Sequence, residues 1–272
     1  MNFKRIWALT TKDLREFTKS KFVMAAIIGI PLMFAVFFPL AILIPMTNVA
    51  GVDIPGDQVE GLVADLIAQT VSNWDTLDNL GKTMVMVAYV LFITVLLLPI
   101  IIPAVTASET VVGEKERKTI EAILASPIKE SEIVIAKILS SVLPSFIGTS
   151  AAAIGYMVIT DIVLYKLLGF VLFPNFLSIV FVFIFGPLFS TISVELMIMV
   201  STKVKSVRDS YQIGSLVVLP LILLIGGEMI LFLFNSYAAL FGGVGVMVVL
   251  ILILYKIAVS IFNRENVIAK MV

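Results

Sequence analysis

Long apolar runs separated by short polar segments make up most of this chain. Six runs are long enough to form membrane-spanning helices, because about 20 apolar residues cross the ~30 Å hydrocarbon core of a bilayer. The spans are predicted at residues 22–45, 84–107, 133–160, 176–200, 211–234 and 244–261. The pattern therefore predicts an all-α integral membrane protein in which residues 22–272 form a single transmembrane domain.

Prolines and glycines fall inside several of these runs. They include Pro31, Pro39, Pro99, Pro103 and the pair Gly186-Pro187. Proline lacks a backbone N–H and clashes with the preceding helical turn, so we expect the spans to bend at these points. A short apolar link with Asn235, Ser236 and Gly242-Gly243 is expected between the last two spans.

Residues 1–21 have the pattern of an amphipathic helix. At ~100° per residue, one stripe contains Phe3, Ile6, Trp7, Thr10, Leu14 and Phe17, and the opposite side carries Lys4, Arg5, Lys12, Arg15, Glu16 and Lys19. Such a helix is expected to lie in the membrane interface, with its basic side toward anionic headgroups. A signal-peptide leader is the alternative, but the apolar run that follows is too long and lacks a small-residue cleavage site.

Residues 46–83 form the longest polar segment between two spans. They carry Asp53, Asp57, Glu60, Asp65, Asp75 and Asp78 against a single base, Lys82. Val59, Leu62, Val63, Leu66 and Ile67 repeat at helical spacing. This loop therefore contains either an amphipathic helix resting on the outer membrane surface or an ordinary solvated loop with nascent helix.

Composition supports the membrane assignment and excludes much chemistry. The chain is 60% hydrophobic and 14% charged, with a mean hydropathy of +1.11. This is too apolar for an ordinary soluble domain. Cysteine and histidine are both absent. Disulfides, thiol nucleophiles, most zinc sites and imidazole acid–base catalysis are thereby excluded.

Basic residues are distributed unevenly although the net charge is zero. They gather before the first span, between the second and third, between the fourth and fifth, and at the end of the chain, whereas Lys82 and Lys166 alone lie on the other side. Loops rich in lysine and arginine stay in the cytoplasm. We therefore expect both termini to be cytoplasmic in the cell membrane and the acidic loop to face outward.

The longest charged segment between two apolar runs is residues 109–137. Acidic and basic side chains alternate in it, which suits docking to a protein better than binding nucleic acid. Ile120, Ile123 and Leu124 fall at i, i+3 and i+4, and Glu114 and Lys118 are spaced for a helical ion pair, so a short amphipathic helix is predicted. Ser126 and Pro127 are expected to end it. Lys137 is near enough to the start of its span to snorkel toward water.

Few residues offer chemistry within the spans. Gly81-Lys82-Thr83 resembles the end of a nucleotide-binding loop, but Thr76 stands where such a loop needs glycine, so no ATP site is predicted. Glu195 and Glu228 are acidic residues within apolar spans, and an ionisable group at membrane depth is a candidate for function. For Glu195, a salt bridge with Lys203 or a partner helix is the plainer interpretation. For Glu228, a place at the exit of a pathway and a structural role are equally open.

The order of residues in the charged segment resembles the signature segment of type-2 ABC exporter permeases. The matching residues are Glu114-x-Glu116, then Thr119 to Leu124, then Ser126-Pro127-Ile128, Glu132 and Lys137. The plan of an elbow helix at residues 1–21 followed by six spans also resembles this family. The external loop is larger than in minimal drug-exporting members.

The resemblance implies a mechanism with a separate motor. Two permease copies, or two related permeases, would form the pathway in the lipid bilayer, and an ABC ATPase subunit would dock beneath each. ATP and magnesium would bind that ATPase, so this chain would hold no cofactor. Segment 109–132 would carry the coupling helix, between Gly113 and Ala125. Ile120, Ile123 and Leu124 would anchor it, and Glu114, Glu116, Arg117 and Glu121 would form its polar rim.

Other functions remain open from the sequence. An ion-gradient-driven secondary transporter or channel would use Glu195 and Glu228 and need no ATPase. An intramembrane enzyme would need a Ser–Lys or paired-Asp site, but Asp161 and Asp209 are predicted on opposite sides of the membrane. The exported substrate is not readable; a hydrophobic molecule, lipid, drug, peptide or sodium would each suit the apolar spans.

Overall fold

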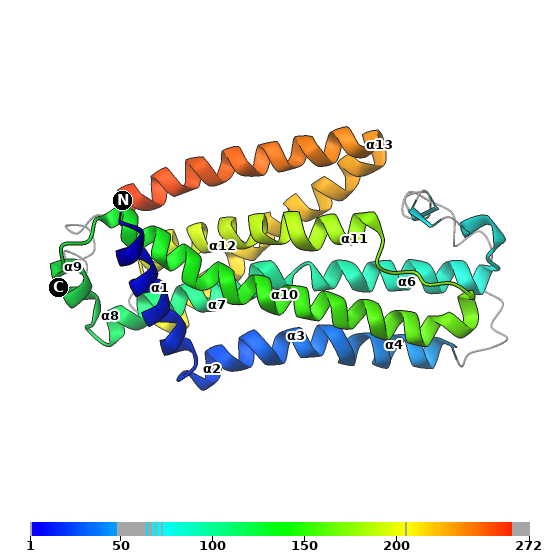
Figure 1. Cartoon of the computed structure of the whole chain (residues 1–272), viewed down its shortest axis with the longest axis horizontal. Coiled ribbons are helices and arrows are strands. Elements are labelled where there is room, and N and C mark those ends of the chain that lie inside the picture. The colour runs from blue at the N-terminus through cyan, green and yellow to red at the C-terminus, as the bar shows by residue number, and fades with distance from the viewer. Residues whose placement is uncertain are drawn as a thin grey trace. The chain divides into compact units, whose positions relative to one another are not determined.

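The computed structural model of the chain is helical, without strands, across the residues it describes, which are 2–47, 64, 67–68, 70–71, 73–204 and 206–262 (Figure 1). The all-α prediction is confirmed. In chain order the elements are α1 (Phe3–Phe17), α2 (Lys21–Met24), η1 (Ala25–Gly29), α3 (Ile30–Leu32), η2 (Met33–Phe37), α4 (Phe38–Thr47), η4 (Trp74–Thr76), α6 (Asn79–Val95), α7 (Leu98–Ser108), η5 (Glu109–Gly113), α8 (Glu114–Glu116), α9 (Ile120–Ala125), α10 (Glu130–Leu168), α11 (Phe176–Val180), η6 (Phe181–Phe185), α12 (Gly186–Ser201) and α13 (Val207–Ile261).

Six helical stretches within the described ranges are long and apolar enough to cross a membrane, as predicted. They are Lys21–Thr47, Asn79–Glu116, Glu130–Leu168, Phe176–Ser201, Val207–Gly227 and Phe241–Ile261. Two of them extend well beyond the predicted spans, because their helices continue past the apolar run into charged residues. The link predicted at residues 235–243 is helical too, since α13 runs through it.

Three prolines account for π-helical turns within the spans. The π-helical turns η1, η2 and η6 each end two residues before a proline, at Pro31, Pro39 and Pro187. A proline ring collides with the carbonyl four residues earlier, and in each case that carbonyl lies inside the π turn. The wider turn moves the carbonyl away from the ring. The predicted bends thus take the form of widened turns.

Near Pro99 the second span is interrupted in a different way. Helix α6 ends at Val95 and α7 begins at Leu98, after turn hydrogen bonds from the Leu96 and Leu97 amides to Ile93 and Thr94. The interruption predicted from Pro99 and Pro103 is therefore present, just before the first of the two prolines.

The chain divides into two compact units. Unit 1 comprises Met1–Ile27, Pro99–Ile147 and Phe185–Val272, and unit 2 comprises Ile28–Leu98 and Gly148–Ile184. In unit 2, Tyr89, Phe92, Tyr156 and Phe173 form an aromatic cluster, with the Tyr156 hydroxyl donating to the Ala88 carbonyl at 2.6 Å. The amphipathic helix considered for the loop at residues 46–83 lies mostly outside the described residues; its Ile67 is described and buried.

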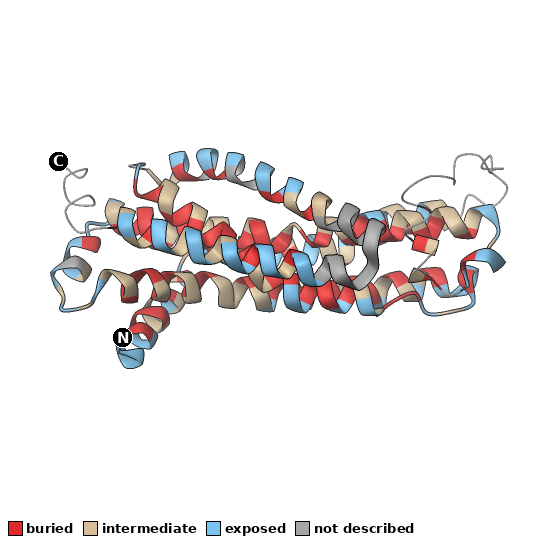
Figure 2. Cartoon of the chain, turned by 90° about the horizontal axis from the view of Figure 1, so that it is seen from above, coloured by how far each residue is buried: buried red, intermediate tan, exposed pale blue. Residues whose placement is uncertain are grey.

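Unit 1 has an apolar core built from helices far apart in the sequence. Side chains of α1, α7, η5, α9, α10, α12 and α13 meet in it. They are Ile6, Leu9, Ala107, Val111, Ile120, Ile133, Val134, Ala136, Val194, Met197, Ile198, Ala258 and Phe262. Burial is uneven along the chain: Figure 2 shows exposed residues along the helices, and only 11% of the apolar window in Phe241–Ile261 is buried.

Helix α1 packs part of the stripe predicted for the lipid boundary against the protein instead. Its buried residues are Ile6, Leu9, Thr10, Asp13 and Phe17, which lie against other parts of unit 1, whereas Phe3 and Trp7 are exposed. In Figure 1, α1 (dark blue) runs across α10 rather than along it. The helix thus has a protein-facing stripe, while Phe3 and Trp7 of the predicted stripe stay exposed.

Candidate functional site

The charged segment after the second span is folded as two short helices rather than one. Helix α8 closes the helical stretch that begins with α7 at Leu98, and Lys118 then adopts a positive φ of 57°. Residues other than glycine seldom take this conformation, and a right-handed helix cannot continue through it. The predicted continuous helix from Gly113 to Ala125 is therefore wrong, and so is the helical pair between Glu114 and Lys118. Helix α9 is a separate six-residue helix.

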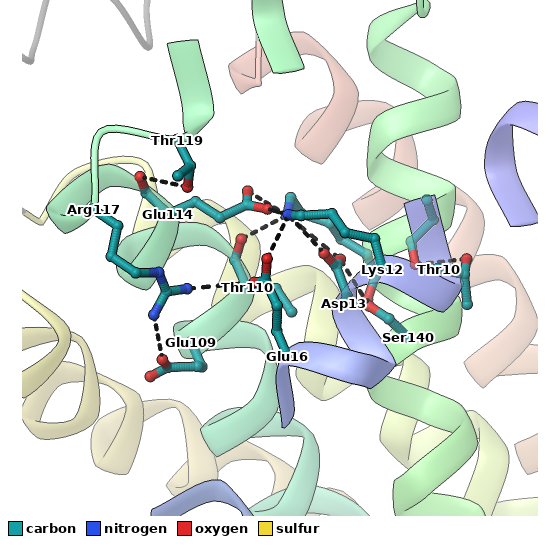
Figure 3. Close-up of polar contacts among 12 residues, drawn as sticks. Thr10, Lys12, Asp13, Glu16, Glu109, Thr110, Glu114, Arg117, Thr119 and Ser140 are labelled. Atoms are coloured by element: carbon teal, nitrogen blue, oxygen red, sulfur yellow. Dashed lines mark hydrogen bonds and ion pairs between the residues drawn. The ribbon is translucent and has the colours of Figure 1, made fainter. Parts of the chain in front are cut away.

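Glu114 points into unit 1 and meets two lysines (Figure 3). Its Oε2 lies 2.7 Å from Nζ of Lys137 on α10, and its Oε1 accepts a hydrogen bond from Lys12 on α1. Both Glu114 and Lys137 are almost fully buried. Lys137 also donates to the Thr110 carbonyl at 2.5 Å. The prediction that Lys137 snorkels is wrong, because a buried carboxylate and a carbonyl supply the partners that water would have given it.

Asp13 brings a second carboxylate to the same place. Its Oδ2 lies 3.6 Å from Nζ of Lys137 and accepts a hydrogen bond from Ser140 at 3.3 Å. Lys12 bridges the group, with Nζ 3.3 Å from Asp13 and 3.4 Å from Glu16 in addition to its bond to Glu114. Those three carboxylates could gather around a metal ion, but the Lys12 ammonium contacts all of them. The chain itself thus supplies the positive charge they need.

The other two residues of α8 bind the helices that follow. Lys115 donates from Nζ to the carbonyls of Ser201 and Thr202, at 2.7 and 3.0 Å, where α12 ends. Glu116 accepts the Val207 amide at 2.8 Å, where α13 begins. Positive charge at a helix C-terminus and negative charge at an N-terminus are both favourable. We call Glu114, Lys115 and Glu116 the α8 hub, since these consecutive residues tie α8 to α1, α10, α12 and α13.

Further contacts hold α1 to the hairpin on both sides of α9. Arg117, just after the hub, pairs with Glu109 at 2.8 Å and with Glu16 at 3.5 Å. At the other end of α1, the Asn2 amide donates to Glu132 at 2.6 Å and Arg5 donates to the Pro127 carbonyl at 2.7 Å. The hairpin from α8 to the first turn of α10 is therefore fixed to α1 at its entry and at its exit.

The residues predicted to contact an ATPase are placed in three different environments. Glu114 and Ile120 are fully covered by this chain, whereas Glu116 is exposed and uses Oε1 to accept the Val207 amide. Glu121 and Arg117 are exposed, and Ile123 is half-buried, packing partly against the core of unit 1. Leu124 has a side chain outside the described part of the structure. The exposed surface of the hairpin is thus smaller than predicted, with Ile123 as its apolar element.

Of the two pathway candidates, the structure describes the surroundings of Glu195 alone. Glu195 lies on α12 with 1% of its surface exposed, and the described residues include no ion pair for it. The salt bridge predicted with Lys203 is absent among the described ion pairs, and the alternative, a contact with a partner helix, stays a prediction. Glu228 has a side chain outside the described residues.

Several members of the site carry no recognisable motif in the sequence. Asp13, Lys12, Ser140 and Lys115 were not assigned any site role, although one signal was present. Ile6, Leu9, Asp13 and Phe17 are spaced at i, i+3, i+7 and i+11, which places Asp13 on the same helical face as the buried apolar residues. A carboxylate on such a face predicts a buried cation from another element.

The charges around α1 affect its ionisation equilibria. Partial burial alone would lower the pKa of Lys12, but the carboxylates of Glu114, Asp13 and Glu16 together raise it. Burial is the largest influence on Asp13 and raises the pKa of its carboxyl above the ordinary 3.8, with Lys137 opposing the rise and Glu114 adding to it. Folded Asp13 thus holds a proton more firmly than unfolded Asp13.

Asp13→Asn is expected to change the pH dependence of stability. The stabilising contribution of Asp13 is full below pH 3.8 and declines as the pH rises through the raised pKa. The unfolding free energy of the wild type should therefore fall relative to that of Asp13→Asn over this range. Thermal unfolding of both proteins in detergent at a series of pH values would measure it. If instead the unfolding free energy of the wild type rises relative to that of Asp13→Asn as the pH increases, the fold lowers the pKa of Asp13.

Comparison with known families agrees with this architecture. A family model described as "ABC-2 family transporter protein" matches residues 7–241, which is most of the chain. A search among curated proteins gave no match. The matched region contains α1 from Trp7 onward, the α8 hub and the first five candidate spans up to Gly227. The chain therefore belongs to the ABC-2 transporter family, as a multi-pass membrane permease.

Proposed function

We propose that this chain is the permease subunit of an ATP-driven exporter in the cell membrane, powered by a separate ABC ATPase. In this proposal ATP and magnesium bind only the partner, and two copies of this chain, or this chain and a related permease, form the pathway. The basic residues that flank α1, α8, α9 and the start of α13 favour a cytoplasmic location for this end of unit 1. Both termini would be cytoplasmic as well.

The α8 hub is the observation that carries the proposal. A docked ATPase can move membrane helices only if the contact surface is rigidly joined to them. Helix α9 projects between two long helices, and the hub beside it holds α1, α10, α12 and α13 through buried or charge-assisted hydrogen bonds. A displacement of α9 would therefore reach several membrane helices together.

Helix α9 has a surface suited to a protein partner. Glu121, Ala122 and Ala125 are exposed, Ile123 is half-buried, and Pro127 and Lys129 are exposed just after the helix. A small apolar centre with a charged rim is typical of protein interfaces. Ile120 anchors α9 from below by packing in the core of unit 1, so the helix is held from inside while its outer face stays free for docking.

Purification of the tagged full-length chain in a gentle detergent tests the proposal. An ATP-hydrolysing subunit should copurify, and transport by reconstituted vesicles should require that subunit, ATP and magnesium. Transport by the purified chain alone, driven by an ion gradient, would overturn the proposal and favour a secondary transporter.

Lys12→Gln is expected to separate docking from coupling. The side chain of Lys12 is 35% exposed, lies on α1 and pairs with Asp13, Glu16 and Glu114 rather than with α9, so the ATPase should still copurify. Three carboxylates would lose their common counterion, and the link between α1 and the hub would loosen. We expect ATP-driven transport to fall by about tenfold, equivalent to ~1.4 kcal/mol of coupling. Lys12→Arg, which keeps the charge, should retain most of the activity, and equal losses in both variants would contradict this role.

A further inference from the structure

Glu195 is a buried carboxyl group that the proposed function does not use. It lies on α12 about six residues before the helix ends at Ser201, roughly 9 Å along the axis at 1.5 Å per residue. Only 1% of its surface is exposed, and its Oε2 atom has no hydrogen-bond partner. Tyr255 of α13 is close enough to interact with it electrostatically.

The other polar side chains of α12 are satisfied. Ser190 bonds to Ser145, Thr191 donates to the Pro187 carbonyl, and Ser193 donates to the Ile100 carbonyl. Ser201 bonds to Ser210. Glu195 is therefore the exception on this helix, and its isolation is not a general property of the surroundings.

An isolated carboxylate in such a place is strongly disfavoured. Burying an unpaired charge costs far more than burying a neutral polar group, so the charge must be removed or balanced. Among the described lysines and arginines none pairs with Glu195. The comparison with Glu114 is direct, because Glu114 is just as buried but touches two ammonium groups.

A metal cation does not fit the surroundings of Glu195. Sodium-like or divalent cations need several oxygen ligands, and the described residues place no hydrogen-bonding group against Oε2. A proton needs no such shell and no cavity. We propose that Glu195 is a proton-binding site, which carries its proton at neutral pH in the arrangement described.

The location gives this site a means of exchanging its proton. The neighbouring segment Phe241–Ile261 of α13 is lightly covered by the rest of the chain. Movement of this segment away from α12 would bring Glu195 into contact with water or with a transported cation. The proton would then leave, and it would return when the two helices close again. Proton binding at Glu195 does not depend on the proposed ATPase partner.

Infrared spectroscopy of the purified full-length chain at neutral pH tests the assignment. The wild-type spectrum should contain the carbonyl stretch of a protonated carboxylic acid, shifted in D₂O and lost in Glu195→Gln. The band should persist at pH values where exposed carboxyls, with an ordinary pKa of about 4, have lost their protons. Glu121→Gln, at an exposed position, should leave the band unchanged. Absence of the band from the wild-type minus Glu195→Gln difference would overturn the proposal.

Modification by a membrane-soluble carbodiimide gives an independent measurement, since this reagent attacks protonated buried carboxyls. Mass spectrometry should find the adduct at Glu195 and not at Glu114, which is ionised between two lysines. Equal modification of the two residues would show that burial alone determines the reaction, and would overturn the proposal.

Discussion

Replacing Lys137 with methionine is expected to lower the free energy of unfolding by roughly 3–5 kcal/mol, the cost of breaking a buried ion pair by removing one partner. Methionine has a similar length and helix propensity, so the change removes charge and hydrogen bonding more than volume. Glu114 would lose its 2.7 Å bond, Asp13 would lose its second cation, and the Thr110 carbonyl would lose its donor. Reversible unfolding in mixed micelles, followed by circular dichroism, would measure the loss.

Two further variants make that result specific. Lys129→Met removes an exposed lysine just before α10 and should change stability by less than about 0.5 kcal/mol. Adding Glu114→Met to Lys137→Met removes both buried charges, so the double variant should be more stable than the sum of the two single losses predicts. If Lys137→Met is no more harmful than Lys129→Met, the buried pair contributes little to the fold.

Ile123→Asp is expected to abolish capture of the ATPase subunit. The substitution places a charge in the apolar centre of the exposed α9 surface, where truncation of a central contact typically costs at least about 2 kcal/mol. Each 1.4 kcal/mol weakens binding tenfold, so a complex of ordinary affinity would be lost on dilution. Copurification from membranes, scored by ATP hydrolysis and mass spectrometry, measures the effect. ATP-driven transport should disappear with it.

Ile123 is half-buried, so its effect on folding must be separated from its effect on docking. Ile123→Val keeps an apolar side chain and should retain the partner. Glu121→Lys reverses an exposed charge on the same helix and should weaken capture without shifting the unfolding temperature. Normal copurification with Ile123→Asp would place the docking surface elsewhere on the chain.

The Lys137→Met and Ile123→Asp experiments test two different parts of the hairpin. Lys137 holds the hub to α10 from within, whereas Ile123 lies on the face that remains accessible. A chain lacking the buried pair should lose stability even without any partner. A chain lacking the apolar contact should lose assembly beyond any loss of stability, which Ile123 can also cause because it packs partly against the core of unit 1. The structure of α9, covered on one side by the core of unit 1 and open on the other, accounts for this division.

The sequence by itself determined the helical class, the number of apolar spans and the place of the charged segment between the second and third of them. These properties depend on local composition, because an apolar run long enough to cross a bilayer must satisfy its backbone hydrogen bonds within its own helix. The positions of Pro31, Pro39 and Pro187 likewise predicted where the helices depart from regular geometry.

Only the tertiary structure decided which charges are buried inside the chain and which stay on its surface. Glu114 and Lys118 have ideal helical spacing, yet Glu114 pairs with residues 102 and 23 positions away in the chain. Ile120 has the spacing of a surface ridge and is a core residue instead. The spacing of apolar and charged residues predicts which residues share a helix face, but not which other element packs against that face. The partners of a buried charge are supplied by other helices, so their identity depends on the packing of the whole unit.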